Sequence, residues 1–195
     1  MNLVIDTNWA LDLLLFDEPA AASVRAALQT GQARWLATQG MRSELARVLT
    51  YAALQKQLAA RHCAAEQVLA AFDNLARLLP AAPRAPVLCS DADDQPFIDL
   101  ALAHGATLLT KDRRVLATAR RLAPLGARVA QRWNAVNEAR GQTANKCCRP
   151  QQILKAAAPD CLPACGVQRL PSPSAHALTG AVRAALRHAG TRVSM

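Results

Sequence analysis

Four carboxylates in this sequence stand where they could act together. Two follow short apolar runs that predict buried strands, and two lie on or beside the apolar face of a predicted helix. Carboxylates that face a core are costly unless they are paired, hydrogen-bonded or bound to a cation. Because no His or Cys accompanies them, they suit Mg²⁺ or Mn²⁺ better than zinc. The four are Asp6, Glu44, Asp94 and Asp112.

The two acids that follow apolar runs are expected at one edge of a sheet. Asp6 closes residues 3–5, and Asp112 comes just after residues 106–109. Ligands in open α/β sheets gather at the carboxyl ends of parallel strands. Each of these acids could also cap the helix that follows it. The prediction therefore depends on the convergence of several acids at one edge.

The two helical acids have ordinary alternatives of their own. Glu44 could pair with Arg42 or Arg47 instead of facing a cation. Asp94 could complement the dipole of its own helix, and its neighbour Asp93 carries the same charge. Helical geometry turns Asp93 about 100° away from the apolar face on which Asp94 lies. We therefore predict Asp94 as the site acid and Asp93 as the helix cap.

These acids would be positioned by strands that alternate with helices. Short apolar runs predict strands, and apolar spacings of three and four predict helices. The alternation is typical of an α/β fold, a central parallel sheet with helices on both faces. The predicted strands are residues 3–5, 34–38, 106–109 and 127–130; the predicted helices are residues 9–16, 19–28, one from 41, two within 54–79, 94–104 and 113–122.

Composition favours one folded domain followed by a tail. Of 195 residues, 52% are apolar, which excludes wholesale disorder, and only 4% are aromatic, which favours helices over a β-sandwich. Helical and strand periodicity ends near residue 140, and five of the eleven prolines follow that point. We predict a domain of residues 1–140 and an irregular tail of residues 141–195 with one short helix at 178–188.

The formal charge of +9 belongs mostly to the tail. Residues 1–140 hold 16 Lys and Arg against 13 Asp and Glu, a net charge of +3, whereas residues 141–195 hold 7 against 1, a net charge of +6. A basic balance suits a polyanionic partner such as nucleic acid. A solvated tail without a specific partner fits residues 141–195 equally well.

The six cysteines divide at the same boundary. Cys63 and Cys89 lie in apolar, periodic segments and are expected to be buried and reduced. The remaining cysteines and two histidines lie in the tail with spacings that fit no zinc-binding motif, so unpaired thiols are favoured over structural zinc. These tail residues are Cys147, Cys148, Cys161, Cys165, His176 and His188.

The sequence contains no signal for a membrane or for secretion. No apolar run approaches the ~18–20 residues that cross a bilayer. The first six residues have no basic leader and end in an acid, unlike a secretory signal. We expect a cytoplasmic protein without a membrane partner.

The acids lie in segments that together resemble a known family. Residues 4–8 (Val-Ile-Asp-Thr-Asn), 43–45 (Ser-Glu-Leu) and 103–112 (Ala-His-Gly-Ala-Thr-Leu-Leu-Thr-Lys-Asp), with Asp94 between the last two, resemble the PIN domain. The sequence is most similar to the bacterial toxin-component branch of that family. The resemblance covers residues 1 to about 132, and nothing after about residue 140 resembles the family. It implies a compact, Rossmann-like α/β/α fold.

The resemblance also implies an activity. Such a protein would be a metal-dependent endoribonuclease, the toxin of a toxin–antitoxin pair, using Mg²⁺ or Mn²⁺ and leaving a 5′-phosphate and a 3′-hydroxyl. Its partners would be an RNA substrate, a cognate antitoxin that covers the acidic cleft, and in many members a second copy of the chain. The residues implied as catalytic and metal-binding are Asp6, Glu44, Asp94 and Asp112, with Asn8 and Thr110 in support.

Three basic residues that follow the predicted strand at residues 106–109 could hold phosphates, although a solvated helix start explains them equally well. They are Lys111, Arg113 and Arg114. Two other functions remain open: a structure-specific DNA nuclease on the same fold, and a non-catalytic module that binds nucleic acid or protein with vestigial acids. A nucleotide-binding Rossmann protein is disfavoured because no Gly-rich loop follows the first predicted strand.

Overall fold

The computed structural model describes residues 1–133. Three predictions lie outside the described residues: the boundary near residue 140, the tail helix at 178–188, and the thiols and histidines of the tail. Within residues 1–133 no helix is both long enough and apolar enough to cross a membrane.

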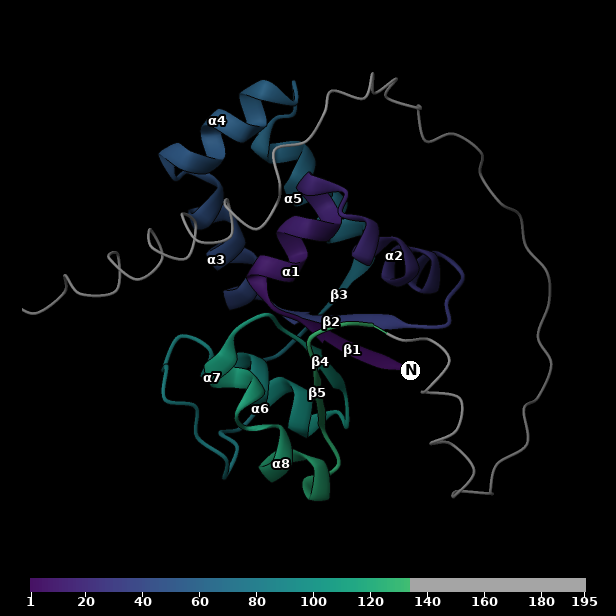
Figure 1. Ribbon diagram of the computed structural model, residues 1–195, viewed down its shortest axis with the longest axis vertical. Coiled ribbons are helices and arrows are strands. Elements are labelled where there is room, and N and C mark those ends of the chain that lie inside the picture. Colours follow the sequence, from purple (N-terminus) through teal and green to yellow (C-terminus); the bar gives the residue numbers. More distant parts are fainter. Residues whose placement is uncertain (134–195) are drawn as a thin grey trace, which may run out of the picture.

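A five-stranded parallel sheet forms the centre of the domain, as the alternating pattern predicts (Figure 1). The strand order is β3-β2-β1-β4-β5, so the chain starts in the middle strand and extends the sheet in both directions. Residues 3–5 of β1 are buried, as expected for a strand covered on both faces. The strands are β1 (Asn2–Ile5), β2 (Arg34–Thr38), β3 (Ala76–Leu79), β4 (Thr107–Leu109) and β5 (Arg128–Ala130).

Helices cover both faces of the sheet (Figure 1). On one face α3 packs on β2 and α5 on β3, and on the other face α6 packs on β1 and β4 and α8 on β5. A π-helical turn (Asp12–Phe16) extends α1, and short 3-10 turns lie at Pro19–Ala21 and Ala123–Leu125. The helices are α1 (Thr7–Leu11), α2 (Ala22–Gln29), α3 (Gln39–Leu49), α4 (Ala52–Ala60), α5 (Ala65–Leu75), α6 (Gln95–Ala103), α7 (Arg113–Leu116) and α8 (Ala119–Leu122).

The core joins these layers through large apolar side chains. Trp35 of β2 meets Phe72 of α5 edge-to-face, with ring centroids 4.8 Å apart. Ile98 of α6 and Leu108 of β4 are fully buried on the opposite face. Burial of such side chains stabilises the fold by about 1.5–3 kcal/mol each, and it fixes the strand ends that carry the site.

One predicted helix segment is a strand. Residues 76–79 were expected within the second helix of the 54–79 region, but they form β3, which pairs with β2 from Trp35↔Ala76 to Thr38↔Leu79. Ala, Arg and Leu favour helices. None of the four residues of this edge strand is fully buried, so its sequence lacks the alternation of apolar and polar residues that marks a strand. Pairing with β2 therefore overrides the local helical preference.

Two smaller corrections concern helix length and cysteine burial. The helix predicted at residues 113–122 is two short helices, α7 and α8, and the one at residues 9–16 changes from α to π geometry at Asp12. Cys63 and Cys89 are half-buried instead of buried, and neither forms a disulfide within the described residues. Burial raises the pKa of the Cys89 thiol, so it is protonated at neutral pH.

Candidate active site

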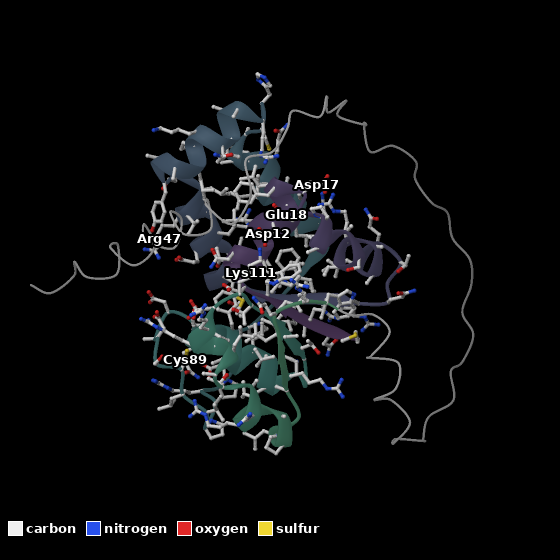
Figure 2. All side chains as sticks on the ribbon, viewed as in Figure 1. Asp12, Asp17, Glu18, Arg47, Cys89 and Lys111 are labelled. Carbon is white, nitrogen blue, oxygen red and sulfur yellow. The ribbon has the colours of Figure 1, made fainter. Side chains whose placement is uncertain are left out.

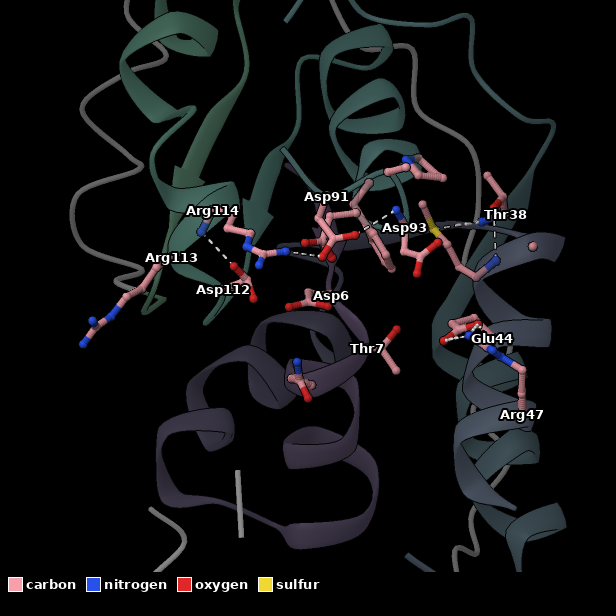
Figure 3. Close-up of a pocket in the computed structure, with 17 residues that line it drawn as sticks. Asp6, Thr7, Thr38, Glu44, Arg47, Asp91, Asp93, Asp112, Arg113 and Arg114 are labelled. Atoms are coloured by element: carbon pink, nitrogen blue, oxygen red, sulfur yellow. Dashed lines mark hydrogen bonds and ion pairs between the residues drawn. The ribbon is translucent and has the colours of Figure 1, made fainter. Parts of the chain in front are cut away.

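An open cleft of about 1120 Å³ lies beyond the carboxyl ends of β1 and β4 (Figure 3). The register pairs Ile5 with Leu109, so the two strands end side by side. This placement confirms that the acids after β1 and β4 lie at the same end of adjacent strands. The cleft is lined by six acids, Asp6, Glu44, Asp91, Asp93, Asp94 and Asp112, and by three arginines, Arg47, Arg113 and Arg114.

Asp6 forms the floor of the cleft. Its side chain is 5% exposed, and the Thr110 hydroxyl donates a hydrogen bond of 2.9 Å to its Oδ2. Burial raises the pKa of Asp6 to about 6, against the lowering effect of the bond from Thr110 and of the backbone amides of Asn8 and Thr7. No cation within the described residues forms an ion pair with Asp6. Its negative charge at neutral pH is therefore stabilised by hydrogen bonds alone.

Asp94 lies at the start of α6, in the N-cap position, and faces the same cleft. Burial raises its pKa to about 7, and the charges of Asp6 and Asp112 add to the shift. The neighbouring Asp93 is exposed and does not cap the helix, because α6 begins only at Gln95. The predicted cap at Asp93 is therefore wrong.

Asp112 is tied to Asp6 through one hydroxyl group. The Asp112 backbone amide donates to Thr110 Oγ1 at 3.0 Å, and that hydroxyl in turn donates to Asp6. Asp112 Oδ1 also accepts a 2.7 Å bond from the backbone amide of Arg114, so it caps α7. Its role as helix cap and its position in the cleft are compatible, since the carboxylate has a second oxygen.

Glu44 lies on the opposite wall, on α3 (Figure 3). Arg47 donates from Nε to Glu44 Oε2 at 2.9 Å and from Nη2 to Oε1 at 2.7 Å, so the pairing alternative for Glu44 is present. Arg42 pairs instead with Asp73 at 2.6 Å. Glu44 is thus a predicted site acid whose charge is offset by an arginine of its own helix.

The other predicted residues divide between the cleft and its support. Asn8 and Arg113 line the cleft, and Thr110 lies beneath it as the partner of Asp6. Arg114 lines the cleft and forms a 2.7 Å ion pair with Asp91. The sequence reasoning did not single out Asp91, although the density of acids in residues 91–94 was a usable signal.

Lys111 does not line the cleft. Its ammonium forms an ion pair with Asp12, a buried acid of the π-helical turn (Figure 2). The same ammonium lies 5.8 Å from the centroid of the Trp9 ring, whose Nε1 donates to Gln131 O at 3.2 Å. Burial raises the pKa of Asp12, and the hydrogen bond and charge of Lys111 oppose that shift.

The donor set fits a hard divalent cation in kind. All six acidic side chains of the cleft offer oxygen, and none of the cleft-lining residues is a His or Cys. Within residues 1–133, however, no three acidic, His or Cys side chains are gathered closely enough to chelate an ion. Like charges repel, so carboxylates without a cation stand apart. An ion at this site would have to draw them together.

Comparison with protein families gives a match over more than half of the chain. Residues 2–114 match the profile of a family described as the PIN domain. The matched segment contains Asp6 on the cleft floor and the helices α3 and α6. It ends two residues after Asp112. No curated protein matches the chain.

Proposed function

The chain belongs to the PIN-domain family, and on this premise we propose that it is a metal-dependent endoribonuclease. PIN domains are generally nucleases, so hydrolysis of phosphodiester bonds is the activity that the family supports. The finer assignment to RNA and to a divalent metal is our proposal. The observation that carries it is the cleft at the carboxyl ends of β1 and β4, which is lined by six carboxylates, with the buried Asp6 on its floor.

The carboxylates of Asp6, Asp94 and Asp112 would hold Mg²⁺ or Mn²⁺, with Glu44 completing the set from α3. A bound ion would act as a Lewis acid on the scissile phosphate and make a coordinated water more acidic. The charges that raise the pKa of Asp94 come from neighbouring acids, so a cation relieves repulsion that the protein otherwise retains.

Other side chains of this protein have supporting tasks. Thr110 holds the Asp6 carboxylate and the Asp112 backbone in one arrangement, which fixes two of the acids relative to each other. Arg113 and Arg114 add positive charge to the wall formed by α7, where they would attract the phosphates of RNA. Nothing in this set reads bases, so the proposal names no RNA sequence.

We also propose that this nuclease is the toxin of a cytoplasmic toxin–antitoxin pair. A cleft with six acids would attract a basic side chain, and an arginine of an antitoxin inserted there would compete with the metal. Co-purification with the product of a neighbouring small gene, together with loss of RNA cleavage on its addition, is the expected result. A nuclease that this product neither binds nor inhibits would contradict the toxin assignment.

The decisive experiment incubates the purified full chain with end-labelled RNA and, separately, DNA, in Mn²⁺ or in EDTA. We expect cleavage of RNA in Mn²⁺ only. Cleavage of DNA alone would indicate the structure-specific DNA nuclease, and binding without cleavage would indicate a non-catalytic module. Asp94→Asn tests whether the activity belongs to this cleft, and Asp93→Asn, one residue away and exposed, is the matched control.

A further inference from the structure

Arg47 is the only cleft-lining cation on the α3 side of the described structure. Its guanidinium holds both oxygens of Glu44, at 2.9 and 2.7 Å, and its side chain is 49% exposed. Because the guanidinium bonds both Glu44 oxygens, a metal that binds Glu44 would compete with Arg47 for the charge and some of the lone pairs of this carboxylate. Arg47 and a metal ion would therefore compete for the Glu44 carboxylate.

The three cleft arginines stand on opposite walls. Figure 3 shows Arg47 beside Glu44 on α3, and Arg113 and Arg114 on the far side, with Asp6 and Asp91 between them. Arg114 is paired with Asp91. A nucleic-acid strand that places one phosphate among the carboxylates would extend towards one arginine wall in each direction. Arginine suits such a position because its planar fork binds two phosphate oxygens at once.

Stability alone does not account for the Glu44–Arg47 pair. Pairs three residues apart on an exposed helix surface contribute little to folding. The same helix carries a second ion-paired arginine, Arg42, which makes two bonds of 2.6 and 2.7 Å to Asp73 of α5 and does not line the cleft. Arg42 is therefore a natural reference for what an ion pair on α3 does without access to the cleft.

We propose that Arg47 is a substrate-binding residue that Glu44 holds until a divalent cation takes Glu44, and that the released guanidinium then binds an RNA phosphate on the α3 wall. The RNA strand would thus cross the cleft between Arg47 and Arg113. This inference rests on the proposed function. It makes metal binding and RNA binding cooperative, because the ion frees the side chain that the RNA needs.

The first measurement titrates the full chain with Mn²⁺ by calorimetry, without RNA. Arg47→Ala removes the competitor for Glu44, so the variant should bind Mn²⁺ more tightly, by about 1.5- to 5-fold, the equivalent of one exposed ion pair. Arg42→Ala should leave Mn²⁺ affinity unchanged. A mere loss of structure at α3 would weaken metal binding instead.

The second measurement follows a fluorescein-labelled, 12-nucleotide single-stranded RNA of mixed sequence by anisotropy. Ca²⁺ replaces Mn²⁺, and a gel verifies that the RNA stays intact. Arg47→Ala should weaken RNA binding and lower the slope of log affinity against log salt concentration by about 0.7, the value of one lost phosphate contact on a single strand. Arg47→Lys should keep the slope, and Arg42→Ala should resemble the wild type.

Opposite effects of Arg47→Ala on metal and on RNA support the inference. Weaker Mn²⁺ binding, or an unchanged RNA affinity and salt slope, overturns it. A wild-type chain that neither binds nor cleaves RNA overturns the proposed function instead, and the Mn²⁺ titration then still reports whether Arg47 competes for Glu44. The two failures are therefore distinguishable.

Discussion

Two buried aspartates six residues apart have opposite surroundings. Asp6, on the cleft floor, is 5% exposed and is stabilised by a hydroxyl and backbone amides. Asp12, under the π-helical turn, is 7% exposed and has the ammonium of Lys111. Both have raised pKa values because both are buried. Only Asp12 has a cation from the described part of the chain, so only Asp6 leaves room for a cation from outside.

One short segment serves both regions. Thr110 bonds Asp6 on the cleft floor, and Lys111 pairs with Asp12 beneath the π-helical turn. Asp112 lines the cleft, so three consecutive residues connect the two regions. The Asp12–Lys111 pair thus anchors the segment that carries a site acid. Both aspartates are buried, so burial alone does not distinguish the cleft from the Asp12 region. The two regions differ in whether a cation of the chain pairs with the buried aspartate.

The largest expected effect is the loss of RNA cleavage when one acid of the cleft is replaced. Asp94→Asn should lower Mn²⁺-dependent RNA cleavage by at least about 100-fold, equivalent to about 2.7 kcal/mol of transition-state stabilisation. Metal-free stability should be unchanged or higher, because the variant removes a repelled charge. Cleavage rates and urea unfolding in EDTA measure both. Asp93→Asn should keep most of the activity; an inactive Asp93 variant beside an active Asp94 variant would reverse the assignment.

The next largest effect is a loss of stability when the buried Asp12 loses its partner Lys111. Lys111→Met should destabilise the fold by about 2–3 kcal/mol, because it leaves the buried Asp12 carboxylate without its ammonium. The loss should be smaller than the ~3–5 kcal/mol of a fully buried pair, since the Lys111 side chain is 29% exposed. Urea unfolding at pH 7 measures it. The double variant Asp12→Leu/Lys111→Met should recover most of the stability, and no recovery would argue against the pair as the cause.

A pH series tests the raised pKa values of the two cleft acids Asp6 and Asp94. The folded-state pKa values of Asp6 and Asp94, about 6 and about 7, lie above the unfolded value of 3.8. Between pH 4 and 7 the folded state therefore binds more protons, and metal-free stability should fall as pH rises. From pH 5 to 7 the loss should be about 2 kcal/mol, after discounting Asp94 for its partial exposure.

Urea unfolding in EDTA at several pH values tests this expectation. The double variant Asp6→Asn/Asp94→Asn should lose most of the slope. For the wild type, Mn²⁺ at 100-fold excess over its dissociation constant should restore about 2.7 kcal/mol at pH 7. A metal-free stability that rises from pH 5 to 7 would contradict the raised pKa values.

The smallest effect concerns the hydroxyl that joins Asp6 to Asp112. Thr110→Val should cost about 1 kcal/mol and raise the pKa of Asp6 further, since the Thr110 bond lowers it. Carboxyl chemical shifts followed by NMR against pH report the change. Thr118→Val is the control: Thr118 is equally buried, and its hydroxyl bonds the Val115 carbonyl away from the cleft. Equal shifts in the two variants would argue against a specific role for Thr110.

The sequence could predict the meeting of Asp6 and Asp112, because strand ends and helix caps have local signals. It could offer Arg47 as a partner for Glu44 three residues away on the same helix, but it could not predict ion pairs between distant segments. The pairs Lys111–Asp12 and Arg114–Asp91 join distant segments and use residue types that are common on any surface. β3 was missed for a related reason, since an edge strand of helix-favouring residues is defined by its neighbour and not by its own pattern.

The long separation between Asp6 and Thr110, joined by a hydrogen bond across 104 residues, has a consequence during synthesis. The first acid leaves the ribosome early, whereas the segment 110–112 is made only after β4, the fourth of the five strands along the chain. At about 5–20 residues per second, ~5–20 s separate the two events. For that interval the Asp6 carboxylate lacks the Thr110 hydroxyl that bonds it in the folded chain. Each new molecule therefore passes through a stage in which the floor of the cleft is made but not yet held in place.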